Sequence, residues 1–214
     1  MEKIIHQIWI GPYEMPEREK RFVSKVKEKN KSYKHILWTN DNLPELPDNL
    51  KELYATFEKA EDYVHQADIL RIFLIAEYGG IYMDVDFDCV GSIENTDLSD
   101  SNGFFCYHGA DDYTMPNGVF GVAKSSQMAK FLFSTVQPDN QWYGPSWLGD
   151  TVKEFLGYER ETSHELVKSE LAKIGIKYLT FNLWESRFFK HHALYSWSPE
   201  NKANFKNGNI NYLW

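Results

Sequence analysis

The 214-residue chain is poor in cysteine, with only Cys89 and Cys106 and no C-x-x-C pair. A disulfide framework therefore has no basis, and two buried thiols in a reducing compartment are expected. No apolar run approaches the ~18 residues that a membrane-spanning helix needs. The first eleven residues include Glu2 and His6 and have no small-residue cleavage site of a signal peptide. We expect a protein without a transmembrane segment that works in the cytoplasm, unless a flanking segment outside this sequence anchors it.

Positive charge is also scarce, because 23 Lys and Arg residues are set against 31 Asp and Glu residues, for a formal net charge of -8. Proteins that bind a polyanion through its backbone are usually basic, so no nucleic-acid partner is expected. The basic residues that exist cluster within 17–34. We interpret this cluster as the solvated face of a surface helix, with a membrane or partner contact as the alternative.

Several common active-site motifs are missing from the sequence. It contains no Walker A motif, G-x-G-x-x-G, G-x-S-x-G or H-E-x-x-H. These absences argue against the common classes of nucleotide-binding protein, serine hydrolase and zinc protease.

The hydrophobic pattern switches repeatedly between strand and helix periodicity. Strands are predicted at 4–10, 35–38, 81–87, 103–107, 119–123 and 176–179, and helices at 17–30, about 48–58, 60–78, 125–135 and 163–174. Gly79 and Gly80 should end the strongest helix. The alternation predicts one α/β domain over 1–214, with a central, mostly parallel mixed sheet flanked by helices. Ligands of such sheets bind beyond the carboxyl ends of the strands, here just after Ile10, Trp38 and Met83.

Residues 81–88 alternate apolar and polar side chains. Because an extended chain repeats every two residues, Asp84, Asp86 and Asp88 would share one face, with neighbours about 7 Å apart. Carboxylates that converge at a buried strand end repel one another unless a cation neutralises them. The pattern predicts Mn²⁺ or Mg²⁺, held by one or two carboxylates and by substrate phosphates. An acidic surface loop without a ligand is the alternative.

Two further groups of polar residues accompany the acidic segment. Asp68 and Arg71 form an i,i+3 pair on a very apolar helix. They are either a buried structural pair or the wall of a cleft, in which Arg71 donates to hydroxyl or phosphate oxygens and Asp68 accepts from sugar hydroxyls. His191 and His192, late in the chain, are either ordinary surface residues or extra ligands for Mn²⁺.

Taken together, these segments resemble the DXD-containing sugar transferases of glycosyltransferase family 32 and, more distantly, the clostridial toxin glucosyltransferases. The resemblance rests on residues 4–11, 37–39, 67–71 and 78–86, with weaker matches at Asn117, Gly144-Pro145 and 191–197. The D-x-x-R pair, the double glycine and the D-x-D at this spacing are its most specific part. The resemblance implies a GT-A fold, a nucleotide-sugar donor, a divalent metal and transfer with retention of anomeric configuration.

The resemblance also implies roles for individual residues. Trp9 would stack on the donor base, and Asp68 and Arg71 would hold the donor sugar. Asp84 would reach the ribose and the metal shell, and Asp86 would bind the metal. Ile8, Thr39 and Tyr82 are further candidates on the donor side, and His192 is a candidate metal ligand. Either His192, or Ser196 with Trp197, would close over the diphosphate. Asn117 and Asp150 are candidates on the acceptor side.

These residues lead to a predicted function, with alternatives left open. We expect a retaining, metal-dependent transferase that moves a hexose or deoxyhexose from a UDP-sugar to a glycan hydroxyl, as in polysaccharide biosynthesis. A GDP-sugar (mannosyl) transferase is the first alternative, and a non-catalytic nucleotide-sugar-binding module is the second. A haloacid-dehalogenase-type phosphatase is the third, although Asp88 and Cys89 replace the small residue and the threonine expected there.

Overall fold

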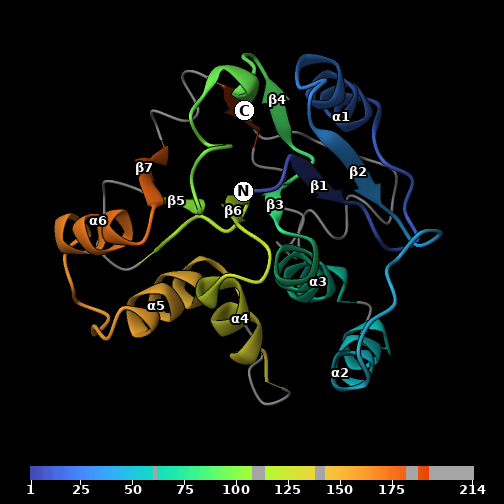
Figure 1. Ribbon diagram of the computed structural model, residues 1–214. Coiled ribbons are helices and arrows are strands. Elements are labelled where there is room, and N and C mark those ends of the chain that lie inside the picture. Colours follow the sequence, from blue (N-terminus) through green and yellow to red (C-terminus); the bar gives the residue numbers. More distant parts are fainter. Residues whose placement is uncertain (60–61, 108–113, 138–142, 182–187, 193–214) are drawn as a thin grey trace.

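The computed structural model describes residues 1–59, 62–107, 114–137, 143–181 and 188–192, and is built around one mixed β-sheet (Figure 1). The six strands have the order β2-β1-β3-β6-β5-β7. They are β1 (Ile4–Ile8), β2 (Lys34–Trp38), β3 (Gly80–Met83), β5 (Gly103–Tyr107), β6 (Val119–Val122) and β7 (Ile176–Thr180). β1 pairs in parallel with β2 and β3, and β5 with β7, whereas β6 is antiparallel to β3 and β5. The predicted mostly parallel mixed sheet is confirmed.

Helices cover both faces of this sheet (Figure 1). On one side lie α3 (Tyr63–Tyr78), α4 (Gln127–Ser134) and α5 (Pro145–Phe155), with α2 (Asp48–Lys59) outside α3 and α6 (His164–Lys173) along β7. On the other side lie α1 (Glu17–Lys29) and a small antiparallel sheet of β4 (Phe87–Cys89) and β8 (Phe189–His191). A short 3-10 helix (Ile93–Asn95) follows β4.

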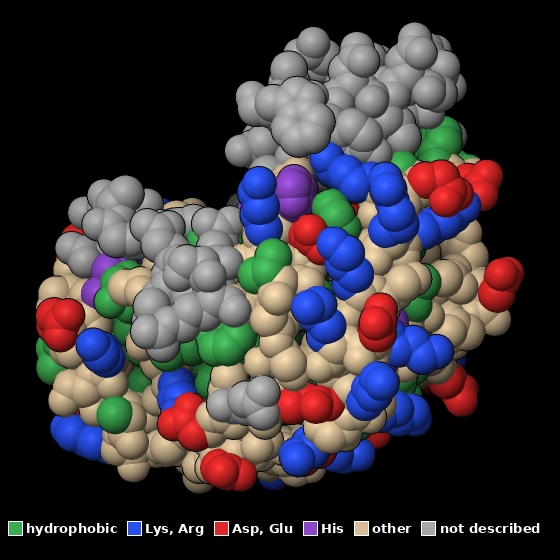
Figure 2. Space-filling view, turned by 90° about the horizontal axis from the view of Figure 1, so that it is seen from above, with side chains coloured by type: hydrophobic (Ala, Val, Ile, Leu, Met, Phe, Trp, Pro, Cys, Tyr) green, Lys and Arg blue, Asp and Glu red, His purple; other side chains and the backbone are tan. Residues whose placement is uncertain are grey.

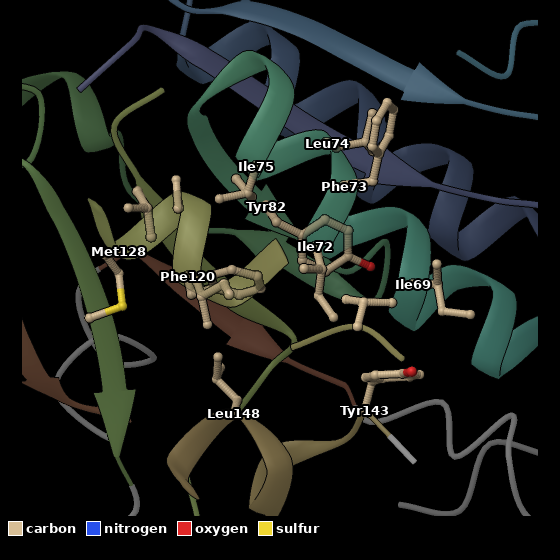
Figure 3. Packing of buried hydrophobic residues seen from close by; sticks show 14 of the residues in the cluster. Ile69, Ile72, Phe73, Leu74, Ile75, Tyr82, Phe120, Met128, Tyr143 and Leu148 are labelled. Carbon is tan, nitrogen blue, oxygen red and sulfur yellow. The ribbon is translucent and has the colours of Figure 1, made fainter. Parts of the chain in front are cut away.

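Helix α3 is the most buried helix of the layer that covers the first face. Its side chains pack with Tyr82, Phe120 and Leu148 from the sheet and α5 (Figure 3). Each fully buried Leu or Ile contributes about 1.5–3 kcal/mol, so packing, more than intrinsic propensity, fixes this helix. The Asp62 carboxylate caps its first turn by accepting from the His65 N–H, and Gly79 ends it with φ +68°. The predicted helix end is confirmed.

Helix α1 exposes most of its basic side chains and buries Phe22 and Val26 against the small sheet. Figure 2 shows Lys and Arg side chains gathered on this face of the molecule. The interpretation of the basic cluster as a solvated helix face therefore agrees with the structure. The two cysteines are free and buried, as predicted. None of the described helices is both long enough and apolar enough to cross a bilayer.

Two predictions about local structure were wrong, and one helix was not predicted. The strand expected over 81–87 ends at Met83, residues 84–86 form a turn, and the chain pairs again only in β4. Asp88 therefore leaves the face that Asp84 occupies, and its carboxylate accepts from the Lys25 ammonium of α1 at 2.8 Å. Helix α5 was not predicted, although Gly144-Pro145 is a recognisable helix start, with proline in the first turn.

Candidate functional site

Several of the residues that the sequence singled out meet at one edge of the sheet. β1, β2 and β3 all end there, at Ile8, Trp38 and Met83. Because β6 runs in the opposite direction, it begins at this edge, and Val119 lies opposite Met83. The residues before β6 thereby join the site, although they lie more than thirty residues along the chain from the D-x-D segment.

A buried cluster of charged and polar side chains forms the floor of the site. We call it the Arg71 cluster, and its members are Asp68, Arg71, Tyr82, Asp84 and Asn117. The Arg71 guanidinium lies 3.0 Å from Asp68 Oδ1 and 3.5 Å from Asp84 Oδ1. It donates to the Asn117 carbonyl at 2.7 Å, and its Cζ lies 4.6 Å from the centre of the Tyr82 ring. The Asn117 amide in turn donates to Asp68 Oδ1 at 3.2 Å. Asn117, predicted on the acceptor side, thus contacts Asp68 and Arg71, which were predicted on the donor side.

Burial and charge together set the protonation of this cluster. Burial raises the pKa of Asp68 to about 6, although Arg71 acts in the opposite direction. Burial disfavours the charge of Arg71, but Tyr82 and the carboxylates of Asp84 and Asp68 outweigh it, so the pKa of the guanidinium is raised. Burial also raises the pKa of Tyr82 well above its ordinary value, so its hydroxyl keeps the proton that it donates to Asp84 Oδ1 at 2.5 Å. Arg71 is therefore a fixed cation that lies between the carboxyl groups of Asp68 and Asp84.

Asp84 offers one carboxylate oxygen to a ligand. Oδ1 is engaged by Tyr82 and Arg71, whereas Oδ2 receives no hydrogen bond from the described part of the chain, and 31% of the side chain remains exposed. A Cβ at Gly118 would lie 2.7 Å from Oδ2, so only glycine leaves this oxygen its present space. Burial raises the pKa of Asp84 despite Arg71, and the nearby Asp86 carboxylate raises it further. A cation beside both carboxylates would relieve this repulsion.

The donor set of the D-x-D turn, residues 84–86, suits Mn²⁺ or Mg²⁺. Both metals prefer carboxylate oxygens, and both keep positions for water and substrate phosphates. Among the described residues, no group of three or more His, Cys, Asp or Glu side chains is arranged as a complete metal site. Two carboxylates alone fit an open site that substrate would complete.

The two late histidines approach the turn in different ways. His191 Nε2 lies 3.5 Å from Asp86 Oδ2, and its ring stacks on Phe87 with centroids 4.5 Å apart. His192 contacts Asp86 through its backbone N–H, which donates to the Asp86 carbonyl at 3.0 Å, while its ring stacks on Phe22. Burial, and then Arg18, lower the pKa of His192. The imidazole nearest the Asp86 carboxylate is therefore that of His191, and His192 as a metal ligand stays a prediction.

The residues predicted to hold the donor base lie at the ends of β1 and β2. Ile8 is buried, the Trp9 N–H donates to the Trp38 carbonyl at 2.8 Å, and the Trp9 indole donates to the Tyr13 carbonyl at 2.9 Å. Thr39 is tied into the following turn, where its N–H donates to Asn42 Oδ1. The strand ends thus fix the backbone of all three residues.

The remaining predicted residues are Ser196, Trp197 and Asp150. Ser196 and Trp197 fall outside the described residues. Asp150 belongs to α5, and its carboxylate lies 3.6 Å from an Arg160 nitrogen. Among the described residues, its ion pairs include none with the Arg71 cluster. Its role on the acceptor side stays a prediction.

Sequence reasoning missed two residues that touch Asp84. Gly118 leaves space for the carboxylate, as described above. The fully buried Gln7 donates from its amide to the Asp84 carbonyl at 3.2 Å. A polar amide in the middle of the apolar first strand is the sequence signal that could have drawn attention to Gln7.

The fold is a known one. It is similar to the solved structure of the PaToxG glycosyltransferase, with a TM-score of 0.58 and 16% identity, covering 80% of this chain and 84% of that one. At this identity the likeness concerns the fold, which is the GT-A fold of glycosyltransferases.

Sequence comparison adds a match to a protein family over part of the chain. Residues 16–104 match the family described as glycosyltransferase sugar-binding region containing DXD motif. Mannosyl phosphorylinositol ceramide synthase SUR1 of Saccharomyces cerevisiae is 36% identical over 91 residues, which are 41% of this chain and 23% of the yeast protein. The uncharacterized glycosyltransferase L373 of Acanthamoeba polyphaga mimivirus is 29% identical over 141 residues, which are 62% of this chain and 54% of the viral protein.

These matches confirm the resemblance drawn from the sequence. Residues 16–104 are similar to the sugar-binding region of DXD-containing glycosyltransferases, and the chain spans between about a quarter and about half of the length of these two relatives.

Proposed function

We propose that this chain transfers a hexosyl group from a nucleoside-diphosphate sugar to a hydroxyl acceptor at the Arg71 cluster. The observation that carries the proposal is the placement of Arg71. Its guanidinium is only 7% exposed, lies between Asp68 and Asp84, and adjoins the D-x-D turn. Its Nε has no acceptor among the described residues. A buried N–H donor without an acceptor is costly, and an oxygen of a bound donor would satisfy it.

A divalent cation fits the D-x-D turn of this chain. Asp86 and Asp84 Oδ2 would hold Mn²⁺ or Mg²⁺, with His192, or His191, as an additional ligand. When bound, the metal supplies a positive charge that stabilises the leaving diphosphate. The predictions of metal dependence and of anomeric retention are both part of this proposal.

The protein's own residues position the donor and stabilise the charge that develops on it. Trp9, with Ile8 and Thr39, holds the base, and Asp68 accepts hydrogen bonds from the sugar hydroxyls. Arg71 stabilises the negative charge as the bond from the anomeric carbon to the diphosphate oxygen breaks. The acceptor hydroxyl forms its new bond on the same face, and its proton passes to the leaving diphosphate. This path needs no protein nucleophile and therefore retains the configuration.

The sequence predicts a UDP-sugar, with GDP-mannose as the alternative. The name of the yeast relative SUR1 refers to mannosyl transfer, which favours the GDP alternative. The glycan acceptor, a role in polysaccharide synthesis and a cytoplasmic location stay predictions.

A thermal-shift experiment tests the metal and the donor together. UDP-glucose, UDP-galactose and GDP-mannose are each added with and without Mn²⁺. A ligand present at 100 times its Kd stabilises the folded state by about 2.7 kcal/mol. We expect one donor to raise the Tm only with Mn²⁺, and the variant Asp86→Ala to abolish this shift.

The variant Asp88→Ala is a matched control, because it removes a carboxylate of the same segment that is paired with Lys25. It should keep the shift. Equal shifts in the unaltered chain and in Asp86→Ala would contradict the metal assignment. Donor that stays intact after long incubation with acceptor would favour the binding module, and phosphate release from simple esters would favour the phosphatase.

A further inference from the structure

Gln7 links β1 to β2 and to the D-x-D turn that follows β3. It lies in β1 and is completely buried. Its amide nitrogen donates to the Asp84 carbonyl at 3.2 Å, and its amide oxygen lies 2.8 Å from Nε2 of His35 in β2. A chain of hydrogen bonds therefore runs from β2 through β1 to the residue that begins the turn.

The Gln7 side chain replaces a backbone bond at the point where β3 leaves the sheet. The parallel pairing of β1 with β3 stops at His6 and Tyr82, and Asp84 lies past the end of β3. On the opposite side, the Asp84 N–H still donates to the Gly118 carbonyl at 2.8 Å. Without Gln7, the Asp84 carbonyl would lose its bond to β1, and a backbone acceptor near the core would be left unsatisfied.

Hydrogen-bond chemistry fixes the orientation of the Gln7 amide. The Asp84 carbonyl is only an acceptor, so Gln7 must present its NH₂ group to it. The amide oxygen then faces His35, which must present an N–H at Nε2. His35 is therefore the partner that holds Gln7 in the useful orientation.

We infer that Gln7 is a positioning residue that fixes the D-x-D turn from behind, and that His35 orients it. The inference rests on the proposed function only in predicting an effect on metal binding, since the positioning of the turn is a property of the chain itself. Outer partners that orient metal-binding groups typically change metal affinity by about 10–100-fold when they are removed.

The test is the variant Gln7→Met, which keeps an unbranched chain of similar length and has no amide. Calorimetry with Mn²⁺ in the presence of UDP or GDP should show a Kd for the metal at least about tenfold higher than in the unaltered chain. Nucleotide binding without metal should be unchanged. Hydrogen–deuterium exchange in the metal-free protein should be about fivefold faster at residues 84–86, which corresponds to the loss of one hydrogen bond.

Two further variants separate positioning from general stability. Ile5→Val removes a buried methyl group from the same strand and should change neither the Mn²⁺ affinity nor the exchange at residues 84–86. His35→Leu should weaken Mn²⁺ binding and speed the exchange at residues 84–86, as Gln7→Met does, but to a smaller extent. The double variant should show effects no larger than those of Gln7→Met alone. If Gln7→Met proves too unstable to study, His35→Leu carries the same measurements.

The outcomes distinguish this inference from the proposed function. If the unaltered chain binds no nucleotide with Mn²⁺, the proposed function fails, and the exchange measurement still decides whether Gln7 fixes the turn. Exchange and metal affinity that are unchanged in Gln7→Met, or equally changed in Ile5→Val, would overturn the inference while leaving the proposed function intact.

Discussion

Arg71 is a charged side chain that folding removes almost completely from water. Its partners Asp68 and Asp84 return part of the desolvation cost, and Asn117 satisfies one of its N–H groups. Buried pairs of this kind stabilise a fold weakly, because attraction and desolvation nearly cancel. A structural purpose alone is therefore a poor explanation for Arg71, and the donor-binding role proposed above gives a better one.

The residue-scale prediction separates stability from binding. Arg71→Met should lower the free energy of unfolding by about 3–5 kcal/mol, because Asp68 keeps a buried charge without its partner. The double variant Asp68→Leu/Arg71→Met should regain most of that loss and still show no thermal shift with donor. Urea unfolding and thermal-shift assays measure the two effects. Retained donor binding in the double variant would contradict the proposed role.

At the scale of elements, the reversed strand β6 determines what faces the D-x-D turn. Its first residue lies opposite the last residue of β3, so Asn117 and Gly118 reach the turn from the far side. Asn117 contacts Asp68 and Arg71, and Gly118 contacts Asp84. A parallel strand in this position would bring its carboxyl end to the site, and the loop before it would lie at the other edge of the sheet.

The variant Gly118→Ala tests this arrangement. The new methyl group would lie 2.7 Å from Asp84 Oδ2, the end of a side chain that can rotate away. We expect a Tm within a few degrees of the unaltered chain, since a substitution at a partly exposed position alters stability by about 0.5–1 kcal/mol. Binding of Mn²⁺ with nucleotide should weaken at least tenfold. Unchanged metal affinity would show that Asp84 Oδ2 is not used.

At the scale of the whole molecule, buried titratable groups act in opposite directions on stability. Burial lowers the pKa of His6 and of His35 to about 4, so the unfolded chain binds protons more readily than the folded one, and stability rises with pH between about 4 and 6.5. Burial raises the pKa of Asp68 from 3.8 to about 6, so its folded form retains the proton longer. This second effect lowers stability as the pH rises from about 4 to about 6.

The variant Asp68→Asn should remove only the contribution of Asp68, which lowers the stability of the unaltered chain as the pH rises. Relative to the unaltered chain, the free energy of unfolding of this variant should rise by about 2 kcal/mol between pH 4 and pH 7, so that the variant gains stability over the unaltered chain. Urea unfolding of both proteins at the two pH values measures the difference. A difference that does not change with pH would show that Asp68 titrates in the folded protein as it does in the unfolded chain.

The sequence was a good guide to elements whose pattern is local. The helix end at Gly79 and the strands β1, β2, β5, β6 and β7 follow from apolar periodicity and turn residues, and the helix predicted over 60–78 is present as α3 (Tyr63–Tyr78). β4 and β8 have three residues each and pair across about a hundred positions of the chain. No short window contains the reason for either strand, which explains why neither was predicted.

The chemistry of the site was also partly local. Asp68 and Arg71 are three residues apart on one helix, and Asp84 and Asp86 two residues apart, so their types and spacing alone pointed to sugar and metal binding. Gln7 lies 77 positions from Asp84, and Asn117 lies 46 positions from Arg71. Only the sheet, through its strand order and the reversal of β6, brings these residues to the D-x-D turn. The sequence by itself thus determined which charges the site contains, because periodicity and spacing act over a few residues. The tertiary structure decided which neighbours orient and neutralise those charges, because these contacts depend on strand pairing between distant segments.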